Sequence, residues 1–193
     1  MRLRYAGSRA LQQASRPNEC LIMIPAPGGV SLRPFLPSDG DTLIEIFRAA
    51  IAQIAIEEYS EEQCLAWAQA AEDEAGFIEK LGQNVTLVAM KSGKIASFIS
   101  LEANGTIALL YTSPPFARQG IANYLCAAVE LLAQGRKMHT LKVEASDCAQ
   151  TLLAMRGFVP MQRNSKFING QWLTNTLMQK SLEPEATAST PQH

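Results

Sequence analysis

The stretch Leu109-Leu110-Tyr111-Thr112-Ser113-Pro114-Pro115-Phe116-Ala117-Arg118-Gln119-Gly120-Ile121-Ala122 decides the fold of this chain. An apolar strand runs into a Pro-Pro break, a short turn with Arg, Gln and Gly follows, and a long helix with an apolar face begins after it. The first four N–H groups of a helix have no partner inside it, and the helix dipole adds partial positive charge there. Gly120 has no Cβ and lets a ligand approach the backbone closely. The stretch therefore predicts an anion site made of backbone N–H groups rather than of a cluster of Lys and Arg.

The composition is typical of one soluble globular domain, because 47% of the 193 residues are hydrophobic and 18% are charged. A formal net charge of −1 gives no general attraction to nucleic acid or to a membrane surface. No apolar run approaches the roughly 20 residues of a membrane span. The cysteines are far apart in the sequence: Cys20, Cys64, Cys126 and Cys148. We therefore expect reduced thiols in the cytoplasm and no metal site.

Both ends of the chain are expected to lie outside the folded domain. Residues 1–29 are basic, with no acidic residue before Glu19, which predicts a disordered extension or, as the alternative, a transit peptide. Residues 182–193 are polar and contain proline, which predicts a disordered tail. The domain then spans residues 30–181.

Hydrophobic periodicity and turn residues predict the order of the elements between these ends. Ser60-Glu61-Glu62-Gln63 is a capping box that opens a helix, Asn104-Gly105 is a hairpin turn, and Asp147 is expected to cap a further helix. The predicted elements are strand 30–35, helices over 43–55, 60–67 and 75–81, strands 86–90, 95–101 and 106–112, helix 119–134, strand 140–145, helix 147–155 and two strands on either side of Asn169-Gly170. The central strand, helix and strand should form a right-handed parallel crossover. The fold class is therefore α/β with a mixed sheet.

These elements and three short motifs resemble the GNAT N-acetyltransferase superfamily over residues 30–181. The motifs are Arg118-Gln119-Gly120-Ile121-Ala122, Glu144-Ala145-Ser146 and Arg156-Gly157-Phe158. The resemblance implies a mostly antiparallel sheet, flanked by helices, in which the fourth and fifth strands splay apart. Residues 59–68 and 174–180 are similar to one bacterial branch of small, largely uncharacterised GNAT enzymes.

The chain departs from the family's pyrophosphate turn at one position. That turn usually reads Gln/Arg-x-x-Gly-x-Gly/Ala, and Gly120 and Ala122 match its last two positions. Ala117 stands where Gln or Arg is usual, and Arg118 is next to it. The departure weakens the contact of a side chain with the pyrophosphate more than the contact of the backbone with it.

The resemblance implies acetyl-CoA as the acyl donor. Its phosphates would lie on the N–H groups of Gln119, Gly120, Ile121 and Ala122. Arg118 would contact a phosphate or would remain a solvated surface charge.

The resemblance also implies where the rest of the donor lies. The pantetheine arm would add like a strand beside Leu110, Tyr111 and Thr112, in the splay between the fourth and fifth strands. A backbone N–H near Tyr111 would polarise the thioester carbonyl and stabilise the tetrahedral oxyanion. Ser146 would contact the pantetheine arm, or cap the helix that follows it.

Tyr111 and Glu144 are the candidate catalytic residues. Tyr111 lines the acceptor site or is a core aromatic residue, and Glu144 is a general base, a substrate anchor or an exposed strand carboxylate. Glu57, Glu58 and Glu102 are weaker candidates for attracting a cationic amine or acting as the base.

The usual general acid of the family is missing from this sequence. Many GNAT enzymes place a Tyr four residues before the Gly of Gly-Phe, where it can protonate the leaving thiolate, and Leu153 occupies that position. Either a group such as Tyr111 serves as the general acid, or the thiolate leaves with help from water. A thiol pKa of about 8.5 makes the thiolate a tolerable leaving group. An acyl-cysteine mechanism at Cys148 is disfavoured, because no His neighbours it in the sequence.

The resemblance therefore implies a cytoplasmic enzyme that moves acetyl from acetyl-CoA to a primary amine, by direct transfer in a ternary complex. A small-molecule amine is favoured by the absence of a peptide-docking motif, no nucleic-acid or membrane partner is expected, and a homodimer is a candidate assembly. The alternative, motivated by Ala117 and Leu153, is a non-catalytic acyl-CoA-binding or regulatory module on the same fold.

Overall fold

The elements follow one another in the order that the sequence predicts. The computed structural model describes residues 26–183, and the predicted extension (1–29) and tail (182–193) fall for the most part outside this range. The elements are β1 (Val30–Pro34), α1 (Gly40–Gln53), α2 (Glu61–Ala68), α3 (Glu74–Gln83), β2 (Val85–Lys91), β3 (Lys94–Leu101), β4 (Thr106–Thr112), α4 (Ile121–Gly135), β5 (Thr140–Ala145), α5 (Asp147–Met155), β6 (Val159–Ile168) and β7 (Gln171–Ser181). Short 3₁₀ helices follow α1 (η3, Ala55–Glu57) and β4 (η5, Pro114–Phe116).

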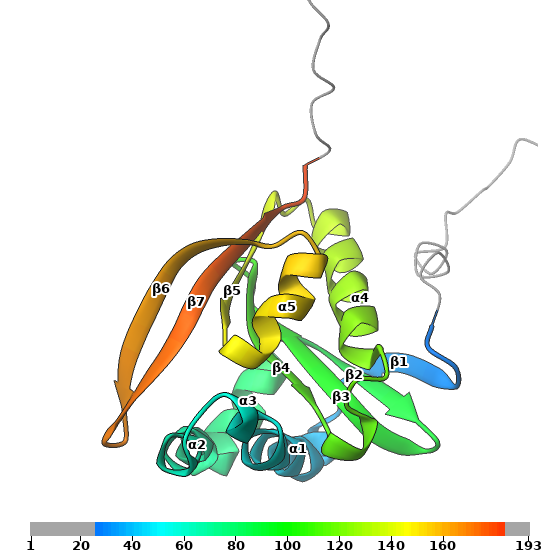
Figure 1. Ribbon diagram of the computed structural model, residues 1–193. Coiled ribbons are helices and arrows are strands. Elements are labelled where there is room, and N and C mark those ends of the chain that lie inside the picture. The colour runs from blue at the N-terminus through cyan, green and yellow to red at the C-terminus, as the bar shows by residue number, and fades with distance from the viewer. Residues whose placement is uncertain (1–25, 184–193) are drawn as a thin grey trace, which may run out of the picture.

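One seven-stranded sheet runs through the molecule in the order β1-β2-β3-β4-β5-β7-β6 (Figure 1). Neighbouring strands are antiparallel except for β4 and β5, which are parallel and joined by α4. This confirms the predicted mixed sheet with a central parallel crossover. The last strand, β7, lies between β5 and β6, so a long β6–β7 hairpin closes one side of the sheet.

The sheet separates two hydrophobic cores. On one face α4 contributes Ile121, Leu125 and Val129, four residues apart, which is the spacing of one helix face. On the other face α1 contributes the core residues Leu43, Ile44, Phe47 and Ile51, which pack with Leu81 of α3 and with Val88 and Phe98 of the sheet. Both layers of helices therefore hold the central strands from opposite sides.

The Asn104-Gly105 turn fixes the start of β4 against β5. Gly105 has a φ of +86°, and a Cβ there would lie 2.6 Å from the carbonyl oxygen of Thr140, so only glycine fits. Asn104 Oδ1 accepts the Thr106 N–H at 2.8 Å, and the Lys142 N–H donates to the Gly105 carbonyl at 3.0 Å. The turn therefore ties the two parallel strands together at their first residues.

The pairing of β4 with β5 then ends. Only Thr106↔Lys142 and Ile107↔Val143 are paired, whereas β3 and β4 stay paired as far as Ser97↔Thr112. The second half of β4 thus runs beside β5 without a ladder, which is the splay that the resemblance implies.

A buried ion cluster joins α4 to the end of α5 and to β7. Glu130 is 8% exposed, and its carboxylate accepts hydrogen bonds from the Arg156 guanidinium and lies 2.8 Å from Lys180 Nζ. Two cations flank this buried carboxylate, so its negative charge is fully compensated. The cluster therefore fixes the position of α5 relative to α4.

Glu130→Ala is expected to lower the free energy of unfolding by about 3 kcal/mol, because it leaves two adjacent cations without their partner in a buried site. Chemical denaturation monitored by circular dichroism measures the loss. Glu74→Ala, which removes one partner of the exposed Arg48–Glu74 pair, is the control and should cost no more than about 1 kcal/mol. Equal losses for the two variants would contradict this role of the cluster.

Candidate active site

A cleft of about 1200 Å³ opens where β4 and β5 separate. Its walls come from the end of β4, the turn into α4, one side of α5 along its length, Trp67 of α2, and the end of α1 with η3. Every predicted cofactor-binding residue except Gln119 lines it: Leu110, Tyr111, Thr112, Arg118, Gly120, Ile121, Ala122 and Ser146. The fold therefore gathers residues from distant parts of the sequence around one cavity.

The turn before α4 presents free backbone donors to this cleft. Gly120 is the N-cap of α4 with φ +78° and ψ 0°, and Arg118 also has a positive φ, of 58°. Within residues 26–183 we find no acceptor for the N–H groups of residues 120–123, and the Tyr124 N–H is the first in α4 to find one, the Gly120 carbonyl at 3.1 Å. Left-handed residues next to a helix start make a concavity of N–H groups that suits an anion.

The Gln119 side chain faces away from the cleft. Its Nε2 donates to the Pro115 carbonyl at 3.0 Å, and its Oε1 accepts from Lys91 Nζ of β2 at 2.5 Å. Ala117 offers no polar side chain, so the turn has no side-chain donor at the position where the family pattern has one. Any contact from Gln119 to an anion would be made by its backbone N–H.

An ion pair crosses the rim of the cleft. Arg118 donates to Glu57 of η3 at 2.8 Å, and both side chains are well exposed and line the cavity. Glu58 lines it as well. Arg118 is therefore next to the turn with the free N–H groups, and its guanidinium is paired with an exposed carboxylate at the rim.

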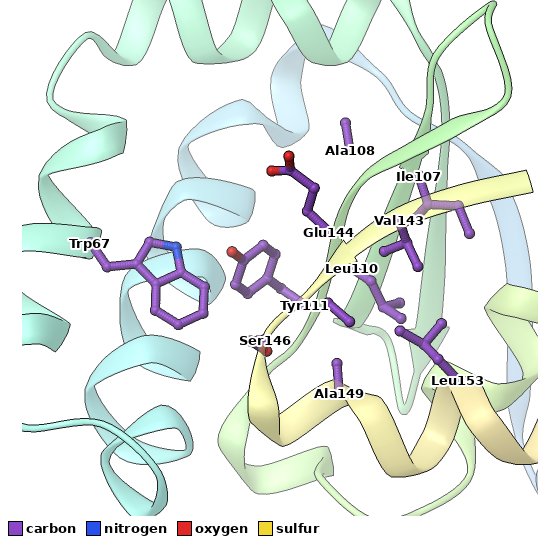
Figure 2. Close-up of a pocket in the computed structure, with 11 residues that line it drawn as sticks. Trp67, Ile107, Ala108, Leu110, Tyr111, Val143, Glu144, Ser146, Ala149 and Leu153 are labelled. Carbon is purple, nitrogen blue, oxygen red and sulfur yellow. The ribbon is translucent and has the colours of Figure 1, made fainter. Parts of the chain in front are cut away.

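A second, small cavity of about 70 Å³ lies between β4 and β5 (Figure 2). It is lined by Trp67, Ile107, Ala108, Leu110, Tyr111, Val143, Glu144, Ala145, Ser146, Ala149 and Leu153. Trp67, Leu110, Tyr111, Ser146 and Ala149 also line the large cleft. The two cavities thus meet at Tyr111 and Ser146.

Tyr111 belongs to an aromatic cluster and lines both cavities. Its ring packs edge-on against Phe47 at 4.8 Å between centroids and stacks on Phe98 at 5.8 Å. Its hydroxyl is directed at the Trp67 indole (Figure 2). Burial raises the pKa of Tyr111 well above the ordinary value, and hydrogen bonding to Trp67 opposes this shift by a smaller amount. Tyr111 therefore stays a neutral phenol across the physiological pH range.

Glu144 lines the small cavity together with Tyr111 but not the large cleft. Its carboxylate is ion-paired with Lys166 of β6, and it lies on the same side of β4 and β5 as Tyr111, opposite Leu153 (Figure 2). Glu102 lines neither cavity, and its carboxylate accepts from Asn104 Nδ2 at 3.1 Å. The structure thus brings the two candidate catalytic residues to one cavity and leaves Glu102 outside.

The start of α5 differs from the predicted one. Ser146, not Asp147, is the N-cap, with the extended φ of −65° and ψ of 159°, and its side chain makes no capping hydrogen bond. The Asp147 carboxylate accepts instead from Arg163 at 2.7 and 2.9 Å and from Gln150 Nε2. Arg163 holds the pKa of Asp147 below its usual range, because its hydrogen bonds and its positive charge favour the charged carboxylate.

The sequence does not identify two residues, Trp67 and Tyr59, as parts of this site. Trp67 lines both cavities, and the Tyr59 hydroxyl accepts the Asp147 N–H at 3.0 Å. Both residues were visible only as parts of a family-like motif beside the capping box. That Ser60 box itself is confirmed, since Ser60 Oγ accepts the Gln63 N–H and Gln63 Oε1 accepts the Ser60 N–H.

Leu153 cannot act as a general acid, and the thiol of Cys148 is a weak nucleophile. Leu153 is fully buried against the small cavity. Cys148 is exposed and lines the large cleft, and partial loss of solvent around its sulfur, with smaller contributions from nearby carboxylates, raises the pKa of its thiol. A raised pKa disfavours the thiolate, so the thiol is a weak nucleophile at neutral pH.

The described part of the chain has neither a helix that could span a membrane nor a cluster of side chains that could hold a metal ion. Every helix within residues 26–183 is too short or too polar to cross a bilayer. In the same range no group of three or more His, Cys, Asp or Glu side chains is arranged to hold a metal ion.

Comparison with known proteins gives consistent matches. The model of the GNAT acetyltransferase domain family matches residues 55–182. The uncharacterised N-acetyltransferase YafP of Escherichia coli is 30% identical over 149 residues, which cover 77% of this chain and 94% of that protein.

Solved structures share the fold. A GCN5-related N-acetyltransferase from Rhodopseudomonas palustris, whose name also carries "Aminotransferase, Class-II", superposes with a TM-score of 0.78 at 42% identity, over 82% of this chain and 99% of that one. The PaiA N-acetyltransferase from Thermoplasma acidophilum, solved in complex with coenzyme A, superposes with a TM-score of 0.67 at 18% identity, over 79% and 98% of the two chains.

Labelling with N-ethylmaleimide, followed by peptide mass spectrometry, is expected to modify Cys148 and to spare the buried Cys64 and Cys126. The rate should rise as the pH is raised above the usual thiol pKa of about 8.5, because burial disfavours the thiolate. Acetyl-CoA, the ligand that the sequence resemblance implies, should slow the labelling of Cys148 by filling the cleft. An unchanged rate in saturating acetyl-CoA would contradict the assignment of this cleft as the donor site.

Proposed function

We propose, from the premise that this chain belongs to the GNAT acetyltransferase family, that it transfers the acetyl group of acetyl-CoA to the primary amine of a small molecule. The observation that carries this proposal is the splay of β4 from β5 beside a turn whose backbone N–H groups are free. A strand-like arm with a diphosphate at one end matches that arrangement. Acetyl-CoA has both parts.

The donor's phosphates would bind the start of α4. The N–H groups of Gln119, Gly120, Ile121 and Ala122 provide donors without a side chain, as the helix terminus allows. Arg118 would exchange Glu57 for a phosphate, since its side chain is exposed at the rim. The coenzyme A complex of the PaiA relative supports a coenzyme A ligand for this fold.

The pantetheine arm would continue along β4. The Ser113 N–H donates to Ala96 of β3, and N–H groups alternate along an antiparallel strand, so those of Leu110 and Thr112 are directed toward β5. Because β5 is no longer paired there, these groups are available to an added strand. One of them would polarise the thioester carbonyl and stabilise the oxyanion that forms.

The acceptor amine would approach through the small cavity. Glu144 would take the ammonium proton directly or through one water, and Lys166 would keep this carboxylate oriented. Holding the thioester and the amine together replaces a bimolecular encounter. The protein's contribution is then mainly orientation, as expected when the cofactor carries the reactive group.

The leaving thiolate needs no strong acid. Leu153 offers no proton, and burial raises the pKa of Tyr111 above the roughly 8.5 of a thiol. Full proton transfer from Tyr111 to a thiolate is therefore uphill. We assign Tyr111 the role of a hydrogen-bond donor at the junction of the cavities; the sulfur leaves as the thiolate anion, hydrogen-bonded by water, and takes a proton from the buffered solvent after release.

A second candidate function is a non-catalytic acyl-CoA-binding or regulatory module. The aliphatic Leu153 and the missing donor at Ala117 favour it. A panel of small primary amines offered with acetyl-CoA separates the two functions, because only the enzyme releases free CoA thiol. Thermal stabilisation by acetyl-CoA is expected for both, so its absence would contradict both. Clear binding with no thiol release from any amine would contradict the enzyme. The small-molecule acceptor and the homodimer stay predictions.

Gly120→Glu is expected to weaken acetyl-CoA binding by more than about 100-fold, measured by calorimetry, because like charges next to each other cost several kcal/mol. The fold should survive, since a Cβ at this position meets only Pro27 at 3.8 Å. The positive φ costs about 1–2 kcal/mol for a residue with a Cβ.

Gly170→Glu is the matched control. Gly170 has a φ of +86° and open space around its Cβ position, in the β6–β7 turn. It should lose similar stability and keep wild-type affinity. Undiminished binding in the Gly120 variant would overturn the phosphate assignment.

A further inference from the structure

The ion pair between Glu144 and Lys166 lies beside the small cavity and is only half-buried. Glu144 of β5 lines that cavity, and Figure 2 shows its carboxylate on the same side of the sheet as the Tyr111 hydroxyl. The Lys166 and Glu144 side chains are 46% and 44% exposed. Exposed ion pairs contribute little to stability, because water solvates both charges when they separate. The pair is therefore not needed to hold the fold together, and both groups are within reach of a ligand.

Each member of the pair keeps room for a further hydrogen bond. Lys166 Nζ donates to Glu144 Oε2, and within residues 26–183 we find no other partner for either charged group. An ammonium group has three N–H donors and a carboxylate has two acceptor oxygens. A ligand can thus donate to Oε1 of Glu144 and accept from Lys166 while the pair stays intact. A ligand with an ammonium group next to a carboxylate would complete a ring of alternating charges.

Asn175 adds an unsatisfied acceptor between the two charges. On β7, Leu177 is paired with Glu144 and Leu173 with Lys166. Alternate residues of a strand share a face, so Asn175 lies between these two rows, on the face that carries the ion pair. Its Oδ1 is shielded from solvent and has no hydrogen-bond partner within residues 26–183. A buried amide oxygen without a donor is costly, and an N–H group of a ligand at the pair would satisfy it.

The charges on this face favour a ligand that brings a carboxylate. Of the charged residues in β5, β6 and β7, the register places Lys142, Glu144 and Lys166 on this face. Arg163 and Lys180 lie on the other face, where each is paired with a carboxylate from a helix. Two cations against one carboxylate leave these strands with a net positive charge on the side of the ion pair. A ligand with two ammonium groups would add like charges, whereas a carboxylate would balance the excess.

We propose that the acceptor is an α-amino acid, whose ammonium group binds Glu144 and Asn175 and whose carboxylate binds Lys166. This inference rests on the proposed function and narrows its substrate class. A simple amine would use only the first half of the site. The amino terminus of a peptide carries a neutral amide in place of the carboxylate, so it would leave Lys166 without its second partner.

Acetyl transfer follows with these groups in place. The bound ammonium gives one proton to Glu144, and its nitrogen attacks the thioester carbon of acetyl-CoA. The C–N bond forms, the C–S bond breaks, the sulfur leaves as the thiolate anion, and the nitrogen gives its second proton to solvent water. The product, an N-acetyl amino acid, has lost the positive charge that Glu144 attracts. The product therefore binds more weakly than the substrate, which favours its release.

The class of acceptor is tested by the release of free CoA thiol from wild-type protein offered the common L-amino acids, each alongside its amide. An amide keeps the shape of the amino acid but lacks its negative charge. The best amino acid should have a kcat/KM about 10- to 100-fold higher than that of its amide, which is the contribution of one charged hydrogen bond. An amide, or a simple amine such as ethylamine, that equals the best amino acid would overturn the proposal.

Lys166→Met tests the carboxylate contact, and Lys94→Met is the matched control. Lys94 is exposed at the start of β3, outside the lining of both cavities. The ratio of kcat/KM for the amino acid to that for its amide should fall to about 1 to 3 in the Lys166 variant and keep its wild-type value in the Lys94 variant. This ratio cancels any general loss of activity from a displaced Glu144. A wild-type ratio in Lys166→Met would contradict the carboxylate contact.

Asn175→Leu tests the third contact. This variant should keep or raise the wild-type melting temperature, because it removes a buried oxygen that has no donor. It should raise the KM of the best amino acid about 3- to 10-fold, the worth of one hydrogen bond, with little change in the ratio of amino acid to amide, since both ligands carry the ammonium group. A lower melting temperature together with an unchanged KM would show that Asn175 is structural and would remove it from the site.

Failure of the proposed function gives a different result. Thiol release with simple amines but with no amino acid would overturn this inference and leave the proposed function standing. No thiol release from any amino acid, amide or simple amine would contradict the proposed function. Calorimetry with the same amino acids in the presence of coenzyme A then decides the binding site. Binding that weakens at least about 10-fold in Lys166→Met would support the site, and binding that survives this change, or no binding at all, would overturn it.

Discussion

The structure depends on the point at which β4 stops pairing with β5, after Ile107 and Val143. Backbone N–H and C=O groups are obligatory hydrogen-bonding groups, and burying them without partners is costly. The second half of β4 avoids that cost because its side toward β5 opens into the cleft. Leu110 and Thr112 therefore direct their N–H groups to a space that water or a ligand fills.

Much of the remaining fold keeps these two strands apart while holding them in place. Gly105 locks their first residues together, through a contact with Thr140 that no other residue allows. β7 pairs with β5 on its far side along its whole length, so β5 cannot shift toward β4. The Glu130 cluster fixes α5 against α4, and the cleft lies between the starts of these helices.

The two cavities offer backbone and side-chain groups in different places. In the large cleft the turn into α4 offers N–H groups, while Ala117 is apolar and the Gln119 side chain is occupied by Lys91 and Pro115. The small cavity has Tyr111, Glu144 and Ser146 in its lining, and the large cleft has further polar side chains at its rim, those of Arg118, Glu57 and Glu58. Under the proposed function, binding of the donor by backbone N–H groups would tolerate the departure at Ala117, whereas the choice of acceptor would depend on side chains.

Local features were predictable from the sequence, and contacts between distant elements were not. The turn at Asn104-Gly105, the Ser60 capping box and the strand-turn-helix at Gly120 depend on neighbouring residues, and the structure confirms them. The position of β7 between β5 and β6 depends on strand pairing that no local pattern encodes. Asp147 was predicted as a cap because its partner Arg163, sixteen residues away, could not be seen, and the Tyr59 hydroxyl bridges still larger separations.

The central claim is that the open side of β4 receives the pantetheine arm of acetyl-CoA. Amide hydrogen exchange of the full chain, resolved by residue with and without saturating acetyl-CoA, tests it most directly. The account predicts slower exchange at Leu110 and Thr112, together with the turn at residues 119–122, and unchanged exchange at the tip of the β6–β7 hairpin. Bound acetyl-CoA that left the exchange of Leu110 and Thr112 unaltered would contradict it.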